Sequence, residues 1–295
     1  MIQKKTISGR IFDIFNYLFM IFMIAVTFYP LYYVLVRSFS NGAALVGSRG
    51  LMLWPKGFNL EAYKAVFANP NILSGYRNTL FIVVIGTTLN VIMTSLAAFL
   101  ITRKNFAIKS ALAYMMIFTM YFSGGLIPNY LLVSNVLHMG DSLSALIFPT
   151  AISAYNVLIM RANFAGIPDS LEESARLDGA NELLILFRII LPLSIPIIAV
   201  MVLFYGVAHW NSWFNAMIYL REREKYPLQL ILREILLMDS SDNMATSASG
   251  GAERFMLGES IRSATIIVAT VPILLVYPFI QRYFVTGIMI GAVKG

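Results

Sequence analysis

Residues 168–196 read PDSLEESARLDGANELLILFRIILPLSIP, and this stretch interrupts a chain that is otherwise built from long apolar runs. It contains five acidic residues and two arginines. The run that precedes it, residues 142–160, carries no charge at all. A charged segment between two hydrophobic runs predicts a surface outside the membrane on which another protein can dock.

The composition of the whole chain indicates a membrane protein. Of its 295 residues, 58% are hydrophobic and 13% are charged, and the mean hydropathy is +0.74. Soluble domains carry about 25% charged residues, so the lipid bilayer is the expected solvent. The net charge of +7 comes from basic residues scattered through loops, which argues against a nucleic-acid partner. The chain has no cysteine, which excludes disulfides and cysteine metal sites.

Six apolar runs predict an all-α integral membrane protein, with residues 1–295 forming a single transmembrane domain. The expected spans are 14–36, 78–102, 110–133, 142–160, 189–213 and 263–284. The charged loop 163–188 lies between the fourth and fifth spans, and the long loops 37–77 and 214–262 are expected outside the cell. A short helix is expected at Leu60–Phe67 in the first of these. Gly124 and Gly125 predict a break near the end of the third span.

The distribution of basic residues places both termini in the cytoplasm. A simple count is a tie, because this topology puts 11 of the 22 basic residues on each side. The dense clusters favour this orientation, since Lys4, Lys5 and Arg10 precede the first span and a second basic cluster occupies 103–109. The first span is too long for the apolar core of a signal peptide, so it is expected to be retained.

The spans lack the groups that drive transport or chemistry by themselves. No acidic residue falls within any of them, whereas ion-coupled carriers usually need an ionisable group at that depth. No cluster of His, Asp and Glu is available to ligate a metal or activate water. The chain also lacks a phosphate loop of the form G-x-x-x-x-G-K-[ST]. We therefore expect no enzyme activity, metal or cofactor in this chain, and any ATP must bind to a partner.

The charged stretch itself predicts a short helix with a defined start. Pro168 suits the first turn of a helix, where its missing N–H needs no partner. Ser170 and Glu173 match a capping box, and Asp169 with Glu172 offers the same pattern one residue earlier. Either version places acidic side chains near the positive end of the helix dipole.

Three residues predict how this helix ends and how the chain continues. Gly179 can adopt the left-handed conformation that stops a helix, and Asn181 can cap the next one. Pro192 removes a backbone donor and disfavours the α conformation at Leu191, which predicts a kink before the membrane. The residues alone leave open a plain solvated loop with ordinary helix caps.

A sequence motif favours the docking surface. Glu173-Ser174-Ala175, three residues, Gly179, nine residues and Ile189-Ile190-Leu191-Pro192 resemble the EAA loop of ABC-importer permeases, E-A-A-x3-G-x9-I-x-L-P. The one departure is Ser174, a small residue in place of alanine. The resemblance covers nearly the whole chain: residues 77–103 resemble the family's second span, 208–220 the exit of the fifth span, and 291–295 the tail of a maltose-type permease. Residues 123–133 and 153–164 look most like the branch for complex oligosaccharides, which includes the alginate importers.

The resemblance implies a type I importer permease, a multi-pass protein of a prokaryotic cytoplasmic membrane. Such a permease pairs with a second permease, and two ATP-binding cassette subunits bind ATP and Mg²⁺. An extracytoplasmic solute-binding protein delivers a carbohydrate, here an oligosaccharide. The coupling helix between spans 4 and 5 docks on the ATPase through residues that correspond here to Leu171, Glu172, Glu173, Ser174, Ala175, Leu177, Asp178 and Gly179. In the maltose system the C-terminal tail also reaches the ATPases, which here implies Gly291, Val293, Lys294 and Gly295.

Other residues are candidates for the transport path. Trp210, Asn211, Trp213 and Asn215 could stack on a sugar and bind its hydroxyls, although aromatics at a span's end more often form an interfacial belt. Asn78, Thr87, Thr88 and Asn90 could line a polar path, although such residues also join helices to each other. The loop 239–253 could reach the binding protein or be plainly disordered. Two other functions stay open: a peptide or amino-acid permease, and an ATP-independent facilitator or channel.

Overall fold

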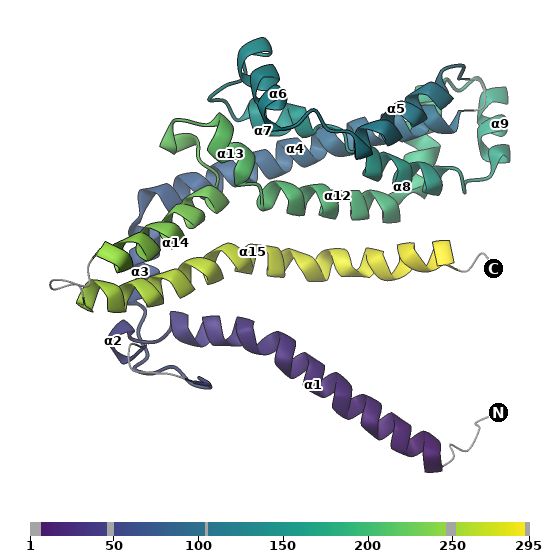
Figure 1. Ribbon diagram of the computed structural model, residues 1–295. Helices are drawn as coiled ribbons and strands as arrows, with labels where there is room; N and C mark the ends of the chain where they lie inside the picture. The colour runs from purple at the N-terminus through teal and green to yellow at the C-terminus, as the bar shows by residue number, and fades with distance from the viewer. Residues whose placement is uncertain (1–6, 46–49, 104–105, 246–251, 293–295) are drawn as a thin grey trace. The chain divides into compact units, whose positions relative to one another are not determined.

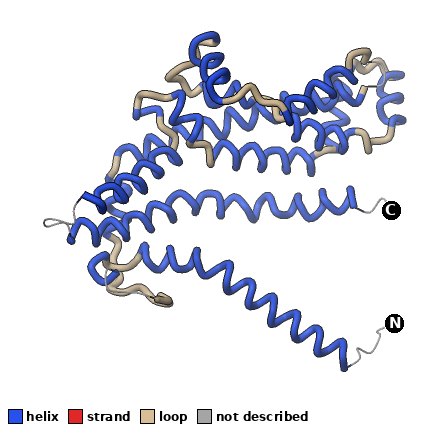
Figure 2. Tube along the Cα trace, in the orientation of Figure 1, coloured by secondary structure: helices blue, strands red, loops and turns tan. Residues whose placement is uncertain are grey.

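The computed structural model describes residues 7–45, 50–103, 106–245 and 252–292, and within these ranges the chain is helical (Figures 1 and 2). The α-helices are α1 (Ile7–Ser38), α2 (Gly42–Leu45), α3 (Glu61–Ala68), α4 (Pro70–Thr102), α5 (Lys109–Tyr121), α6 (Leu126–Leu131), α7 (Ser144–Ile147), α8 (Ala154–Phe164), α9 (Asp169–Leu177), α10 (Glu182–Ile185), α11 (Leu191–Leu193), α12 (Ile195–Trp210), α13 (Phe214–Tyr219), α14 (Leu228–Ala245) and α15 (Ala252–Ala292). Two π-helical segments, η1 (Leu132–Val136) and η3 (Leu186–Ile190), and two 3₁₀ turns, η2 (Phe148–Thr150) and η4 (Arg223–Lys225), complete the described elements. The only β pairing in these ranges is an isolated bridge between Ser40 and Phe58.

The described helices supply between three and six candidate membrane spans. Three helical segments, Ile7–Ser38, Pro70–Thr102 and Gly258–Val276, are long and apolar enough to cross a bilayer on their own. Three further pairs qualify only if each bent pair is one span: Lys109–Tyr121 with Leu126–Val136 (117°), Ser144–Thr150 with Ala154–Phe164 (49°), and Glu182–Leu193 with Ile195–Trp210 (86°). Each expected span thus overlaps a long helix or a bent pair.

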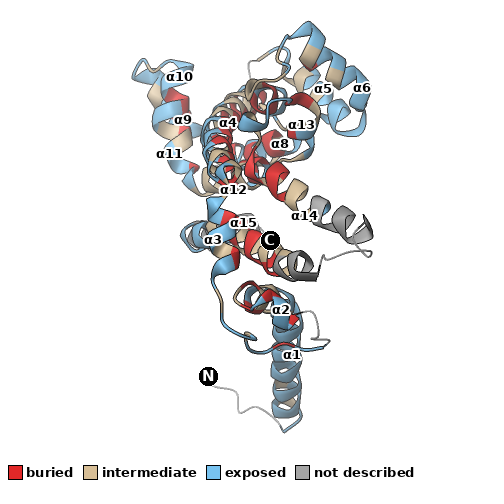
Figure 3. Cartoon of the chain, turned by 90° about the vertical axis from the view of Figure 1, so that its left-hand side faces the viewer, coloured by how far each residue is buried: buried red, intermediate tan, exposed pale blue. Residues whose placement is uncertain are grey.

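Contacts divide the chain into two compact units. One comprises residues 70–233 and 271–295, and the other comprises 1–69 and 234–270. In the first unit α4 is the central helix, and α8 and α12 pack along it. Figure 3 shows the buried residues of this unit gathered on these helices and on α13. One apolar cluster joins the last turns of α4 to α8, η3 and α12, and another joins α4 to η1, α7, α13 and α14.

The break in the third expected span lies where the glycine pair predicted it. Helix α5 ends before Phe122, and α6 begins after Gly125. Gly125 has φ +86°, a left-handed conformation that L-residues with a side chain rarely adopt. The glycine therefore permits the sharp turn between the two helices.

The second unit is held together around residues 37–63. Phe39 stacks on Phe58 with ring centroids 5.6 Å apart and also contacts Tyr63 at 5.1 Å. Arg37 pairs with Glu259 at 2.5 Å. Helix α3 lies within one residue of the short helix expected at Leu60–Phe67. Most side chains of α1 are apolar and exposed, as expected for a helix that is covered by lipid or by another membrane subunit.

The loop expected at 214–262 contains more helix than the sequence suggested. It includes α13, α14 and the first turns of α15. Within the segment 239–253, the chain is helical to Ala245 and again from Ala252, and residues 246–251 lie outside the described ranges. Helix α15 also continues past residue 284, the expected end of the last span, as far as Ala292.

Candidate functional site

Helix α9, the expected coupling helix, begins immediately after Pro168. This proline has φ −60° and ψ 131°, so it precedes the first helical residue instead of lying in the first turn. The N-cap position is Pro168, which has no capping side chain, so the expectation that Ser170 or Asp169 would occupy the N-cap of a capping box is wrong. Two acidic residues, Asp169 and Glu172, still lie in the first turn, where they interact favourably with the helix dipole.

The end of α9 is a glycine turn, as predicted. Gly179 has φ +83°, its N–H donates to the carbonyl of Arg176 at 3.0 Å, and the N–H of Ala180 donates to Ala175 at 2.9 Å. These two bonds form a Schellman motif, which satisfies carbonyls left free at the helix end. Asn181 then caps α10, because its Oδ1 accepts from the N–H of Leu184 at 2.8 Å.

The kink expected at Pro192 is displaced toward the membrane segment. Leu191 is helical, with φ −64° and ψ −44°, so the expectation that proline would exclude it from the α conformation is wrong. The preceding five residues form the π-helix η3, a wider turn that often accommodates a disruption of the backbone bonds. The 86° bend follows at Ser194, between α11 and α12.

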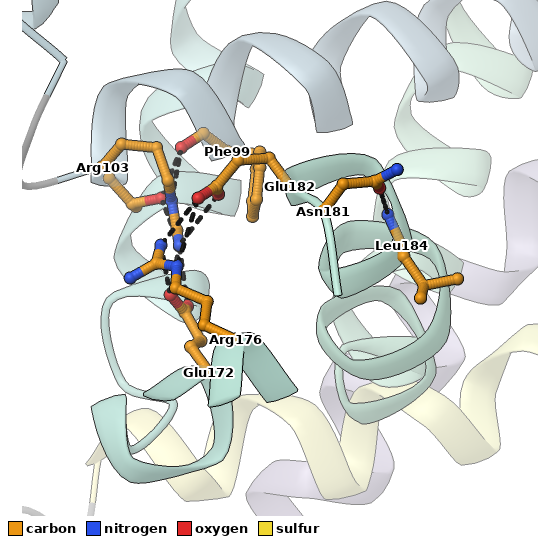
Figure 4. Close-up of polar contacts among 8 residues, drawn as sticks. Phe99, Arg103, Glu172, Arg176, Asn181, Glu182 and Leu184 are labelled. Atoms are coloured by element: carbon orange, nitrogen blue, oxygen red, sulfur yellow. Dashed lines mark hydrogen bonds and ion pairs between the residues drawn. The ribbon is translucent and has the colours of Figure 1, made fainter. Parts of the chain in front are cut away.

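An ion pair between Arg103 and Glu172 joins α9 to the end of α4 (Figure 4). The guanidinium contacts both carboxylate oxygens: Nη1 bonds to Oε2, and Nη2 donates to Oε1 at 2.7 Å. The Arg103 side chain is only 13% exposed and that of Glu172 only 11%. Arg103 also lies over the ring of Phe99, 4.0 Å from its centroid, and Nε donates to the Phe99 carbonyl at 3.4 Å. The pair is therefore bidentate, shielded from water and fixed in orientation.

A second, more exposed ion pair lies beside the first. Arg176 pairs with Glu182 at 2.9 Å, and both side chains are about half exposed, at 43% and 54%. Weaker contacts of 3.8 Å link Arg176 to Glu172 and Arg103 to Glu182. These charges line a cleft of about 380 Å³ between the end of α4 and α9.

The eight expected coupling residues divide into two groups. Glu172 is buried and Ala175 packs against the apolar cluster of the protein's own helices. The others are exposed: Leu171, Glu173, Ser174, Leu177, Asp178 and Gly179. Leu177 is 90% exposed, although it is apolar. Glu172, and not Glu173, makes the described contacts that hold the helix to the rest of the chain.

Three of the four expected sugar-path residues line one cavity of about 600 Å³. Asn211, Trp213 and Asn215 form part of its wall, together with residues from α7, η2, α8 and α12. The fourth, Trp210, does not line it; its ring is buried and lies 6.3 Å from that of Tyr76. The remaining wall residues are Leu146, Pro149, Thr150, Ile152, Ser153, Asn156, Phe204, Tyr205, Ala208, His209, Ser212 and Phe214. This volume falls within the range of about 300–1,000 Å³ that small-molecule sites occupy.

Three polar contacts join α4 to this cavity wall. His209 Nε2 lies 2.7 Å from Asn90 Oδ1, and the amide nitrogen of Asn90 donates to the carbonyl of Thr150 at 2.5 Å. The hydroxyls of Thr94 and Tyr205 lie 2.7 Å apart, and Tyr205 also accepts from the N–H of Ser153 at 3.2 Å. Tyr205 and His209 were not expected to belong to this site, because only the fold brings them to α4.

The other three residues considered for a polar path do not line the cavity. Asn78 donates to the carbonyls of Glu224 and Tyr226 at 2.7 and 3.1 Å, so it holds the loop that contains η4 in place. Thr88 bonds to Val84 within its own helix. Thr87 is buried but does not line the cavity. Of the four residues considered for a polar path, only Asn90 contacts the cavity wall through a described bond.

Asp141 organises the loop that follows α13. It adopts a left-handed conformation with φ +54°, and its Oδ1 accepts from the N–H groups of Arg221 and Glu222 at 2.9 and 3.1 Å. Lys225 Nζ lies 3.0 Å from Oδ2. These donors stabilise the ionised carboxylate and hold the pKa of Asp141 well below its usual value, with the two backbone N–H groups as the main cause.

The C-terminal residues expected to contact an ATPase are only partly described. Gly291 belongs to the last turn of α15, whereas Val293, Lys294 and Gly295 lie outside the described ranges.

Comparisons with known proteins place the chain in a family. No protein-family model matches it. The polygalacturonan/rhamnogalacturonan transport system permease protein YtcP of Bacillus subtilis is 40% identical over 290 residues, which cover 98% of this chain and 100% of that protein. The inner membrane ABC transporter permease protein YcjP of Escherichia coli is 28% identical over 99% of both chains.

A solved structure extends the likeness to the fold. A chain of a bacterial ABC transporter involved in the import of the acidic polysaccharide alginate superposes with a TM-score of 0.84 and 30% identity. The match covers 95% of this chain and 99% of that chain. With this shared fold and 40% identity along the whole length of a transport permease, the chain belongs to the sugar permease subunits of ABC transporters, the non-catalytic membrane components of these systems.

Proposed function

We propose that this permease imports an acidic carbohydrate, with α9 as its coupling helix and the 600 Å³ cavity as part of the sugar path. It crosses the cytoplasmic membrane of a prokaryote six times, with both termini in the cytoplasm. Its partners are a second permease, two ATP-binding cassette subunits that bind ATP and Mg²⁺, and an extracytoplasmic solute-binding protein. The C-terminal residues 291–295 form a further contact to the ATPases.

The observation that carries the coupling role is the construction of α9. Glu172 and Ala175 anchor the helix to its own chain, whereas Leu171 and Leu177 are exposed to solvent. Exposed leucines on a firmly anchored helix form an apolar surface that a partner can cover. The Schellman turn at Gly179 then fixes the direction of the chain toward α10.

The acidic substrate is supported by the relatives and by the charges at the cavity. The relatives are named for polygalacturonan and for alginate, which is an acidic polysaccharide. The residues that line the cavity include no Asp or Glu, so nothing on its wall repels a carboxylate. The guanidinium of Arg233 lies 3.7 Å from the ring centroid of the lining residue Trp213, and among the described residues no acid pairs with it.

Reconstitution of the complete transporter tests the function. The chain is co-purified with its partners, placed in liposomes and supplied with the binding protein and labelled oligogalacturonate or oligoalginate. We expect uptake only when ATP is present, and we expect the variant Gly179→Pro to abolish it. Proline cannot adopt φ +83° and would remove the N–H that bonds to Arg176, so α9 would lose its terminal turn.

The same experiment decides between this function and the alternatives. A facilitator or channel would transport the sugar through the purified chain alone, without ATP. A peptide permease would take up labelled peptides but not acidic oligosaccharides. Full ATP-driven uptake by the Gly179→Pro complex would show that α9 does not couple the two processes.

A further inference from the structure

We propose that Arg103 is a positioning residue for coupling, which passes the movement of α9 directly to α4 and so to the wall of the cavity. The inference rests on the proposed function, because it concerns the route by which the coupling helix acts. It assigns a transport role to an ion pair between residues that are 69 positions apart in the sequence.

The peptide chain offers only an indirect route from α9 to the cavity. It passes through the glycine turn at 179, the short helix α10, the π-helix η3 and then the 86° bend at Ser194. Each of these irregular segments can change its backbone angles when α9 is displaced. A push along this route is therefore partly absorbed before it reaches α12.

Arg103 offers a direct route. Its guanidinium contacts the Phe99 ring and carbonyl, and it also binds both carboxylate oxygens of Glu172 (Figure 4). Bidentate pairs of this kind fix orientation as well as distance. Because both side chains are almost fully shielded, the contact cannot be replaced by water without leaving a buried charge. Helix α9 and the end of α4 should therefore move together.

Helix α4 can carry this movement to the cavity. It is a single α-helix from Pro70 to Thr102, and Arg103 follows its last residue. Thr94, nine residues earlier, touches Tyr205, and Asn90 lies one further turn away and touches His209. At 1.5 Å per residue, the distance from Arg103 to Thr94 is about 13 Å along the helix. Tyr205 and His209 both line the cavity.

The outer ion pair supplies a matched control. Arg176 and Glu182 belong to the same network, but both are about half exposed and neither is part of α4. Exposed ion pairs contribute little because water screens them. If shielding and attachment to α4 are what matter, removing Glu182 should leave coupling unchanged.

The test uses the complete transporter in liposomes and measures the ratio of sugar imported to ATP hydrolysed. Two double variants avoid an unpaired buried charge: Arg103→Ala with Glu172→Ala, and the exchange Arg103→Glu with Glu172→Arg. We expect the double alanine variant to assemble and to hydrolyse ATP while this ratio falls about ten-fold, within the usual range of allosteric coupling. The exchange variant should recover part of the ratio, and Glu182→Gln should match the wild type.

Several results would overturn the inference. Import per ATP at the wild-type level in an assembled double alanine variant would show that coupling does not pass through the pair. Loss of assembly in both double variants would show that the pair only holds the fold. Failure of the proposed function looks different, because then the wild-type complex itself would show no ATP-driven import.

Discussion

The imidazole ring of His209 lies flat against the backbone of α4 at Gly86. A Cβ added to Gly86 would come within 2.6 Å of Nε2, 2.9 Å of Cε1 and 3.0 Å of Cδ2. The ring reaches Asn90 only because this position has no side chain. A glycine on one helix thus sets the position of a cavity-lining side chain on another.

The variant Gly86→Ala should therefore disturb the cavity. We expect the methyl group to displace His209 and break its bond to Asn90, which lowers stability by about 1–3 kcal/mol, as overpacking usually does. Sugar-dependent ATP hydrolysis of the reconstituted complex should also fall, because the cavity wall is disturbed. Thermal unfolding of the purified complex and its ATPase activity measure the two effects.

Gly206→Ala is the matched control at the same helix pair. A Cβ at Gly206 would lie 3.8 Å from Thr87 Oγ1, an ordinary contact. Alanine also favours a helix over glycine by about 1 kcal/mol. This variant should be neutral or more stable. Equal stability and activity in both variants would contradict the role assigned to Gly86.

Arg233 should influence which sugars the complex accepts. Replacing it with glutamine removes a positive charge at Trp213 while keeping a shorter polar side chain. We expect the apparent KM for acidic oligosaccharides to rise about ten-fold, roughly the value of one charge-assisted hydrogen bond. Uptake of a neutral oligosaccharide, if the complex accepts one, should not change.

The control for this prediction is Arg221→Gln. Arg221 is exposed, and its only described bond is made by its backbone N–H, so the substitution removes the same charge without touching Trp213. An equal rise in KM in both variants would indicate a general effect of charge on the outer loop, and not a contact at the cavity.

The sequence predicted the features of this chain that depend on neighbouring residues. Gly179 and Asn181 end one helix and begin the next as expected, because each acts through backbone groups within five residues. The break at Gly125 has the same local cause. The apolar runs likewise located the candidate spans, since the bilayer selects them by length and polarity.

Features that depend on distant partners could not be predicted. Glu172 was one of several acids in a helix until the fold placed Arg103 beside it. Nothing in the sequence connects His209 to Asn90, 119 positions away, and only the fold places this ring in the cavity wall. At Pro192 a local rule gave the wrong result, because the π-helix before it lets the chain stay helical through Leu191.

Asp141 should keep the outer loop in place down to acidic pH. Its folded pKa lies below its unfolded value, so the carboxylate contributes stability above the unfolded pKa of about 3.9, and this contribution is lost as the pH falls further. Limited proteolysis of residues 221–226 should therefore be slow and constant from pH 7 to about pH 5 and accelerate below about pH 4.

The variant Asp141→Asn tests this assignment. Asparagine tolerates the left-handed conformation and its amide oxygen can still accept both backbone bonds, but it loses the charge and with it the ion pair with Lys225. The loop should be cleaved faster at pH 7, and the acceleration at low pH should disappear. Asp178→Asn, at an exposed position directly after α9, should behave like the wild type. An unchanged acid response in Asp141→Asn would assign it to another carboxylate.

Leu177 offers the sharpest test of the docking surface, because it is the most exposed apolar residue of α9 and makes no contribution to the protein's own core. The variant Leu177→Glu should leave the folding of the permease unchanged but weaken its association with the ATPase by about 2 kcal/mol, the loss typical of an interface hot spot, or roughly thirty-fold in Kd. Leu183→Glu provides the control, since Leu183 is also exposed, at 58%, but belongs to α10 beyond the glycine turn. Co-purification of each tagged permease variant with the ATPase, followed by a binding titration, measures the affinity of Leu177→Glu and Leu183→Glu for the ATPase. If both variants bind like the wild type, the partner does not cover this side of α9. If both lose binding equally, the interface extends past Gly179 onto α10, and the coupling surface is larger than the helix alone.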